Sequence, residues 1–275
     1  GNVGLGSGAF GTGLTTGTDN VAIGEAAGDA LTTGSDNTLI GDNAGGALTT
    51  GLRNVAIGSA ALLVSTTASN NTMLGTNAGT AISSGAANVG VGKDALLSLT
   101  TGASNTAVGT VALDAVTTGD YNTAVGRSAL SANTTASNNT AVGYNALLSN
   151  TTGTENVALG NNAGDAITEG NYNIAIGHNA LTSDTLGSRA VAIGRHALET
   201  QNFTTATSDY NIGIGYNTGR LITTGIANTL IGGLAGDALT AGNSNVAVGT
   251  YALGADQLGS KSTALGEGAL NVQNF

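Results

Sequence analysis

The chain of 275 residues has no proline, no cysteine and no tryptophan, and only 9% of its residues are charged. The absence of cysteine fits an extracellular protein as readily as a cytosolic one. Seven basic against 17 acidic residues give a net charge of −10, which disfavours nucleic acid as a partner because phosphate binding needs clustered Lys and Arg. No apolar run approaches the length of about 18 residues that a membrane-spanning helix needs, and no signal peptide is visible. Since the chain begins within a repeat, we expect it to be a fragment of a longer one.

So few charges and 45 glycines would fit disorder, but 40% of the residues are hydrophobic and they recur in a strict register. The register is a five-residue pattern of Asn, a β-branched residue, a small residue, an aliphatic residue and Gly. It occurs sixteen times, and thirteen of the fifteen steps between copies are 17 residues long. The other two steps are 18 and 21 residues. A fixed period of this kind indicates a solenoid. The first residues of the copies are Asn2, Asn20, Asn37, Asn54, Asn71, Asn88, Asn105, Asn122, Asn139, Asn156, Asn173, Ala190, Asn211, Asn228, Asn245 and Ser262.

Each place in the repeat has its own chemistry, and we number the places from the Asn as position 1. Position 2 is Val, Ile or Thr, position 4 is Leu, Ile or Val, and position 3 is mostly Ala or Gly. This alternation predicts a strand with the small residues on one face. Position 5 is always Gly, where a β-carbon would clash with a neighbouring backbone or block a turn with positive φ. Position 8 is Ala in every copy but one, and the Thr-Thr pairs that follow predict a second short strand.

Positions 9 and 12 vary together. Where position 9 is Gly, position 12 is Leu or Ile, as in Gly28 with Leu31; where position 9 is Leu, position 12 is usually polar or small, as in Leu147 with Asn150. Leu96 with Leu99 and Leu113 with Val116 break the rule. The exchange indicates a constant core volume in each layer, as close-packed interiors demand.

These patterns together predict an all-β fold, a parallel β-solenoid of about sixteen coils of 17 residues, forming a single repeat unit over residues 1–275. We expect the position-1 Asn side chains to stack from coil to coil as an amide ladder at one corner, with Gly at the other.

The motifs that could carry chemistry are weak. Gly6–Gly11 matches GxGxxG but lies in a solenoid coil rather than before a helix. His178 and His196 fall at positions 6 and 7 of adjacent coils, which we expect to point to different faces, and no Cys or third His joins them. The aspartates at position 10 lack a calcium repeat, so we interpret them as exposed turn carboxylates: Asp29, Asp114, Asp165 and Asp237. We therefore predict no catalytic residue, cofactor or metal, and no enzyme.

The strand motif NVAIG at 20–24 and 54–58, with NTAVG at 105–109, 122–126 and 139–143, resembles the head repeats of trimeric autotransporter adhesins of the YadA-like family. The fuller unit NTAVGYNALLSNTTG resembles the repeat arrays of phage tail-fibre-like proteins. The resemblance covers all sixteen copies and implies a left-handed β-roll wound as a homotrimer in a structural or adhesive surface fibre. Two departures are that the adhesin repeat is shorter than 17 residues, and that residues 1–275 show neither the anchor of the adhesins nor the chaperone domain of the tail fibres, so both assignments stay open.

A 17-residue coil encloses few apolar side chains, too few to offset about 1–2 kcal/mol of backbone entropy per residue. We therefore expect the Gly-Ala side of each coil, at positions 3, 5 and 8, to face another copy. The predicted chain-chain contact residues are Gly109, Gly126, Ala129, Gly143, Ala146 and Gly160. Tyr121, Tyr172 and Tyr210, before position 1, and Tyr144 and Tyr216, at position 6, are interpreted as packing between chains rather than as ligand platforms.

A four-residue insertion near 201–204 supplies the receptor-contact candidates Gln201, Asn202, Phe203 and Thr204, because an outward Phe on an aromatic-poor rod could contact a receptor. The alternative, which the pattern favours over the first, is that the Phe plugs a bulge in the roll. The sequence predicts an extracellular tail-fibre-like segment on a virion, with a bacterial adhesin head as the alternative. An ice-binding solenoid is a remote alternative, because only one Thr per coil is expected to point outward. The partners expected are its own copies and an unidentified cell-surface receptor or glycan, without membrane insertion.

Overall fold

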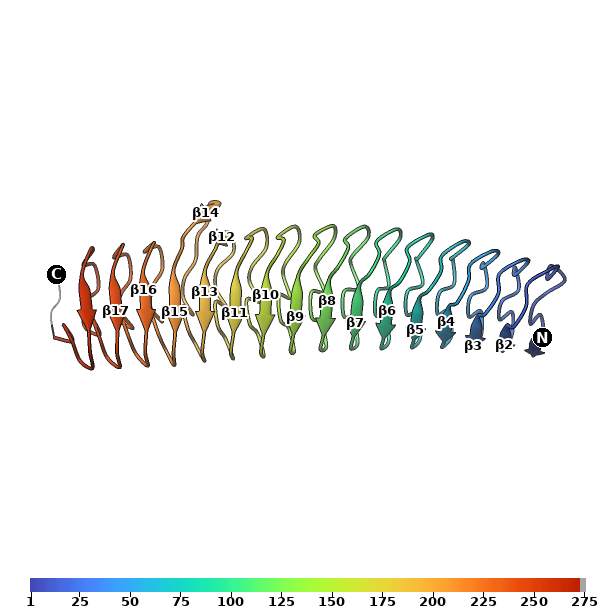
Figure 1. The fold of residues 1–275 in the computed structure, drawn as a ribbon, viewed down its shortest axis with the longest axis horizontal. Coiled ribbons are helices and arrows are strands. Elements are labelled where there is room, and N and C mark those ends of the chain that lie inside the picture. Colours follow the sequence, from blue (N-terminus) through green and yellow to red (C-terminus); the bar gives the residue numbers. More distant parts are fainter. Residues whose placement is uncertain (273–275) are drawn as a thin grey trace. The chain divides into compact units, whose positions relative to one another are not determined.

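The computed structural model describes residues 1–272, which contain no helix. The contacts within the chain divide it into two compact units, Gly1–Asn138 and Asn139–Phe275, referred to below as unit 1 and unit 2. Each unit is a stack of coils in sequence order, and each coil contributes one three-residue strand (Figure 1). The division falls between two repeats, and the prediction of a single repeat unit over 1–275 stays a prediction.

Eight strands lie in unit 1: β1 (Val3–Leu5), β2 (Val21–Ile23), β3 (Thr38–Ile40), β4 (Val55–Ile57), β5 (Thr72–Leu74), β6 (Val89–Val91), β7 (Thr106–Val108) and β8 (Thr123–Val125). Unit 2 holds β9 (Thr140–Val142), β10 (Val157–Leu159), β11 (Ile174–Ile176), β12 (Gly187–Ser188), β13 (Val191–Ile193), β14 (Thr207–Ser208), β15 (Ile212–Ile214), β16 (Thr229–Ile231), β17 (Val246–Val248) and β18 (Thr263–Leu265).

Within each unit the strands of successive coils pair in parallel. The register sets each residue beside its equivalent in the next coil, as Val89 beside Thr106 and Val157 beside Ile174. In unit 2, β12 and β14 form a separate two-stranded pair that belongs to the 21-residue step (Figure 1). The predicted parallel β-solenoid with a 17-residue coil is confirmed.

The predicted second strand at the Thr-Thr pairs is wrong. In unit 1 the N–H groups of Thr32, Thr33 and Gly34 all point at the carbonyl oxygen of Thr49, at 3.0, 3.2 and 3.3 Å. The hydroxyl of Thr32 donates to the same oxygen at 3.0 Å. Several donors that converge on one acceptor require a tight bend, whereas a strand would distribute them over successive carbonyls.

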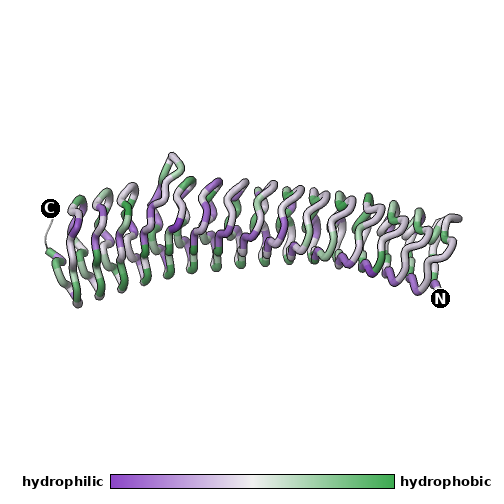
Figure 2. The backbone as a smooth tube through the Cα atoms, turned by 45° about the horizontal axis from the view of Figure 1, so that its top comes forward, coloured by the Kyte–Doolittle hydropathy of each residue, from purple (hydrophilic) through white to green (hydrophobic). Residues whose placement is uncertain are grey.

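Small and aliphatic side chains fill the interior of each coil. The residues at positions 3, 8, 9 and 12 are buried in coil after coil, as Ala141, Ala146, Leu147 and Asn150 illustrate. Hydrophobic segments consequently recur at the same places in successive coils (Figure 2). Coils of only 17 residues leave little room inside, which is why alanine occupies two of these four positions.

The predicted exchange between positions 9 and 12 is explained by direct contact. A β-carbon added to Gly79 would lie 2.8 Å from Cδ1 of Ile82 at position 12 and 2.6 Å from Sδ of Met73 at position 3. Glycine at position 9 therefore makes room for a larger residue at position 12, at position 3, or at both. Leu39 is such a position-3 residue. A β-carbon added to Gly28 or to Gly45 would lie only 2.8 Å from one of its Cδ atoms, so both glycines leave space for its side chain.

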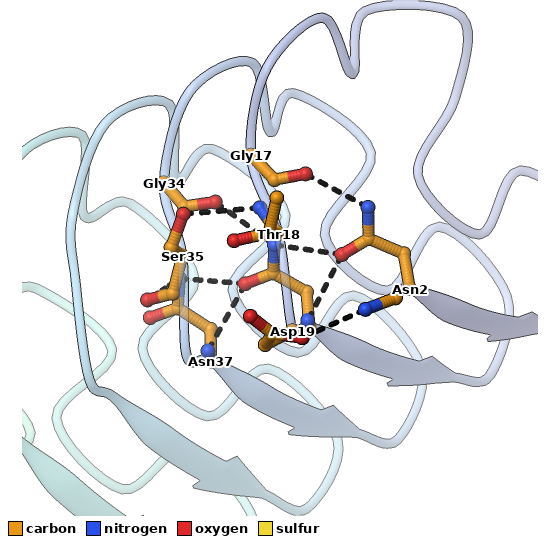
Figure 3. A network of polar contacts seen from close by, with 9 residues as sticks. Asn2, Gly17, Thr18, Asp19, Gly34, Ser35 and Asn37 are labelled. Carbon is orange, nitrogen blue, oxygen red and sulfur yellow. Dashed lines mark hydrogen bonds and ion pairs between the residues drawn. The ribbon is translucent and has the colours of Figure 1, made fainter.

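The predicted amide ladder at position 1 is confirmed. The backbone N–H and Nδ2 of Asn37 both donate to Oδ1 of Asn20 at 3.0 Å, and Nδ2 also donates to the carbonyl of Gly51 at 2.9 Å. Asn37 is fully buried. Figure 3 shows the first rungs, in which Asn2 likewise donates to the carbonyl of Gly17 at 2.8 Å. Each rung thus satisfies a buried N–H and a buried carbonyl that the coil geometry leaves without a backbone partner.

Candidate functional site

Each unit exposes a row of apolar side chains along the outer face of its sheet. Apart from β1, the middle residue of each three-residue strand of the main sheet is buried, whereas its two neighbours at positions 2 and 4 are half-buried or exposed. These outward residues are Val, Ile, Leu or Thr throughout. They form what we call the apolar stripe, and Leu74 in unit 1 and Leu159 in unit 2 are 43% and 47% exposed.

The Gly-Ala side of the coil, predicted to contact another chain, lies elsewhere. Ala129 and Ala146 have no exposed surface because they pack inside their own coils, so the prediction that these alanines form an outer contact face is wrong. The physical reason is that alanine at position 8 packs inside the narrow coil, while the aliphatic residues and threonines of positions 2 and 4 face outward.

The four predicted glycines at position 5, Gly109, Gly126, Gly143 and Gly160, are required by their own chain. Their φ angles lie between 137° and 141°, a region that side chains rarely adopt. An added β-carbon on Gly109 would lie 2.5 Å from the carbonyl oxygen of Gly126, and on Gly143 2.2 Å from that of Gly160. Stacking of coil on coil therefore accounts for the invariant glycine without a second chain.

The insertion places only half of its predicted receptor-contact residues at the surface. Gln201 and Phe203 are buried, whereas Asn202 and Thr204 are exposed. Phe203 is only 6% exposed, so it plugs the widened coil as the favoured alternative has it, and the alternative of an outward Phe is wrong. The segment that follows it protrudes from unit 2 as far as β14 (Figure 1).

The same coil repairs a gap in the amide ladder. Position 1 is here Ala190, which has no amide to accept from the next rung. Oδ1 of Asp209 accepts the N–H of Asn211 at 2.9 Å in its place, and Oε1 of Gln201 accepts from Nδ2 of Asn211 at 2.9 Å. Gln201 in turn donates to Oδ2 of Asp184 at 2.8 Å. The sequence could have indicated this cluster. Before the last copy, Ala190 is the only position-1 residue that is not Asn, and it begins the same coil that carries the insertion.

Two carboxyl groups of this cluster are buried. Asp184 accepts from the N–H groups of Gly187 and Phe203 at 3.0 and 3.1 Å, while Oδ2 of Asp209 is buried without a hydrogen-bond partner. The pKa of Asp209 is raised to about 7, mainly by burial and to a smaller extent by the negative charge of the neighbouring Asp184 carboxylate. Burial likewise raises the pKa of Asp184.

An exposed aromatic corner lies beside the insertion. Cζ of Arg189 lies 5.3 Å from the ring centroid of Tyr172 and 5.7 Å from that of Tyr210, and its guanidinium donates to the hydroxyl of Ser208 in β14. Arg195 lies 5.8 Å from the ring of Tyr216 at the opposite corner. Sequence reasoning placed the tyrosines and Arg189 at this corner of the coil, but it did not predict that the arginine lies against the two rings.

The histidines meet, contrary to expectation. The rings of His178 and His196 are 5.4 Å apart in an edge-to-face arrangement, and Nδ1 of His196 lies 2.8 Å from Glu199. No group of three or more His, Cys, Asp or Glu side chains in residues 1–272 is placed to hold a metal ion. Of the position-10 aspartates Asp29 is exposed, but Asp165 and Asp237 are half-buried and burial raises the pKa of each.

Residues 1–272 include no helix that could cross a membrane. None of the known protein families matches the chain, and neither a curated protein nor a solved structure is significantly similar to it.

Proposed function

We propose that this chain is a non-enzymatic segment of a trimeric extracellular fibre, in keeping with its resemblance to phage tail-fibre-like repeat arrays, and that it spaces or presents a receptor-binding region. The observation that carries the proposal is the apolar stripe, which a single chain leaves open along each unit. Large exposed apolar surfaces on a soluble protein mark interaction sites.

A second copy of the same chain is the partner that fits the stripe best. Its coils have the same 17-residue period, so stripe residues of two copies side by side stay in step at every coil. Each half-exposed Val, Ile or Leu that becomes covered contributes on the order of 1 kcal/mol, before the cost of association is subtracted. The number of three chains rests on the family resemblance.

The interface is tested by placing a charge on the stripe. We expect sedimentation equilibrium to give a trimer for the wild type and a smaller mass for Leu159→Lys, because a lysine there would be desolvated between chains. Thr152→Lys is the matched control, since Thr152 is exposed in a neighbouring coil of unit 2 but lies away from the strand. A monomeric wild type, or a trimeric Leu159→Lys variant, would refute the assembly.

The head of a bacterial trimeric adhesin is the alternative, and it shares the same interface. The two roles differ in what the full-length protein carries, namely a membrane anchor or an intramolecular chaperone. Ice binding has less support. The hydroxyls of Thr32, Thr49 and Thr100, the first threonine of each pair, donate to carbonyl oxygens of the next coil. This leaves at most the second threonine of each pair to face ice, which is one column where a flat ice-binding surface would use two. An ice-recrystallisation assay tests it directly.

A further inference from the structure

Three consecutive coils of unit 2 place Tyr172, Arg189 and Tyr210 at the residue before position 1. All three have positive φ angles, 61°, 69° and 52°, so the chain turns at this residue in the same way in each coil. All three side chains are exposed. The coil period therefore stacks them into one column in which the guanidinium lies between two rings, a cation–π arrangement that fixes its orientation.

Within residues 1–272, Arg189 forms no ion pair with an acidic side chain. Its side chain contacts the rings of Tyr172 and Tyr210 and the hydroxyl of Ser208 instead. This is notable in a chain with 17 acidic residues against seven basic ones. A planar guanidinium that is held in place and free of carboxylates is ready to bind one from outside by two parallel hydrogen bonds.

The column adjoins the segment that protrudes from unit 2 at β14 (Figure 1). Ser208 of β14 accepts a hydrogen bond from Arg189, and β14 pairs with Gly187–Ser188 directly before it. The inserted loop and the tyrosine–arginine column are thus parts of one surface. Loops that rise from a rigid scaffold are common places for binding residues.

We propose that Tyr172, Arg189 and Tyr210, with the β14 hydroxyl of Ser208, form a binding site for a carboxylate-bearing saccharide. The guanidinium binds the sugar carboxylate, and the exposed parts of the rings pack against the C–H face of the pyranose while their hydroxyls bond its oxygens. The two tyrosines are two coils apart, about 10 Å at the usual strand spacing, so an oligosaccharide can lie along the column. This site goes beyond the fibre role and does not depend on the trimer.

A saccharide fits this surface better than a protein does. Specific protein interfaces bury about 1,200–2,000 Å² in total. The column offers two rings and one cation on a convex corner, whereas the wide apolar surface of the chain lies on the stripe. The footprint is therefore that of a small, polar ligand.

The experiment is titration calorimetry of the full chain with a tetrasaccharide of alternating glucuronic acid and N-acetylglucosamine, beside the same tetrasaccharide with its carboxyl groups reduced to alcohols. We expect the acidic probe alone to bind, and Arg189→Gln to weaken it at least tenfold. Arg189→Lys should weaken it as well, because an ammonium lacks the planar fork. Tyr172→Ala should weaken it several-fold.

Tyr121→Ala is the matched control, since Tyr121 occupies the same place in its coil in unit 1 and is 65% exposed, but its neighbours at this place are Ser104 and Asn138. It should leave the affinity unchanged. The proposal is overturned if the acidic probe does not bind at millimolar concentration, if the reduced probe binds equally well, or if Arg189→Gln has no effect. It is also overturned if Arg189→Gln and Tyr172→Ala change the sedimentation mass instead of the affinity, because the column would then be a contact between chains.

Discussion

Replacing Asn156 by alanine removes one rung of the amide ladder in unit 2. Nδ2 of Asn156 donates to the carbonyl of Gly170 at 2.8 Å, and its Oδ1 accepts the N–H of Asn173 at 2.9 Å. Its own N–H, which donates to Asn139, stays in place in the variant. The substitution therefore removes two hydrogen bonds from groups that lie inside the coil stack.

Both groups left behind are buried, and no other partner replaces the lost amide. An unpaired buried donor or acceptor costs about 1–3 kcal/mol, so Asn156→Ala is expected to lower the free energy of unfolding by about 2–6 kcal/mol. The natural sequence supports the size of this cost. At Ala190, the one internal rung without an amide, Asp209 and Gln201 supply the missing acceptors.

Urea unfolding followed by circular dichroism, at one protein concentration, measures the loss. Asn161→Ala is the control in the same coil, because Asn161 is exposed and its change should stay within about 0.5 kcal/mol. Since coils interact mainly with their neighbours, we also expect faster hydrogen exchange at the Asn173 N–H. Equal stabilities of the two variants would show that the ladder contributes no net stability and refute the reasoning.

Two further predictions concern the core. The pKa of Asp209 rises to about 7 on folding from about 3.9 in the unfolded chain, so the folded state loses stability as the pH rises from about 4 to 7, by up to about 4 kcal/mol. Asp209→Asn should therefore be more stable than the wild type at pH 8 and similarly stable at pH 4. If the melting temperatures of the two proteins differ by the same amount at every pH from 4 to 8, this prediction is contradicted. In unit 1, Gly79→Leu should crowd Met73 and Ile82 and lower the free energy of unfolding by about 1–3 kcal/mol. Adding Met73→Ala and Ile82→Asn gives the combination that coil 139–155 carries, and should restore most of the melting temperature. A triple variant that melts no higher than Gly79→Leu would disprove the exchange of volume.

The sequence predicted the features that repeat with every coil. The parallel solenoid and the Asn ladder follow from contacts between equivalent residues of adjacent coils. The exchange between positions 9 and 12 follows from contacts within one coil that recur in each copy, and a strict period makes both kinds of contact readable. Position-12 side chains such as Asn150 and Asp184 were recognised only as polar. The structure adds that they turn back to bond the backbone three residues on, at Gly153 and Gly187.

Which side of the strand faces the interior could not be decided from alternation. Positions 2 and 4 are apolar and so is position 3, so a period of two admits both orientations. The small residues look suited to an outer contact, but positions 3 and 8 pack inside the narrow coil, where Leu39 and Met73 fit beside a glycine at position 9, and positions 2 and 4 face outward. The burial of Phe203 has a similar cause, since the widened coil needs a plug.

The amino-acid sequence by itself determined the period, the parallel pairing and the corner chemistry of Asn and Gly, because these depend on what each residue meets one period later. Only the tertiary structure decided the direction of the apolar stripe and brought Tyr172, Arg189 and Tyr210 into one column beside β14. Both depend on the width and curvature of the closed coil, which the packing of the whole layer sets and no single repeat position encodes.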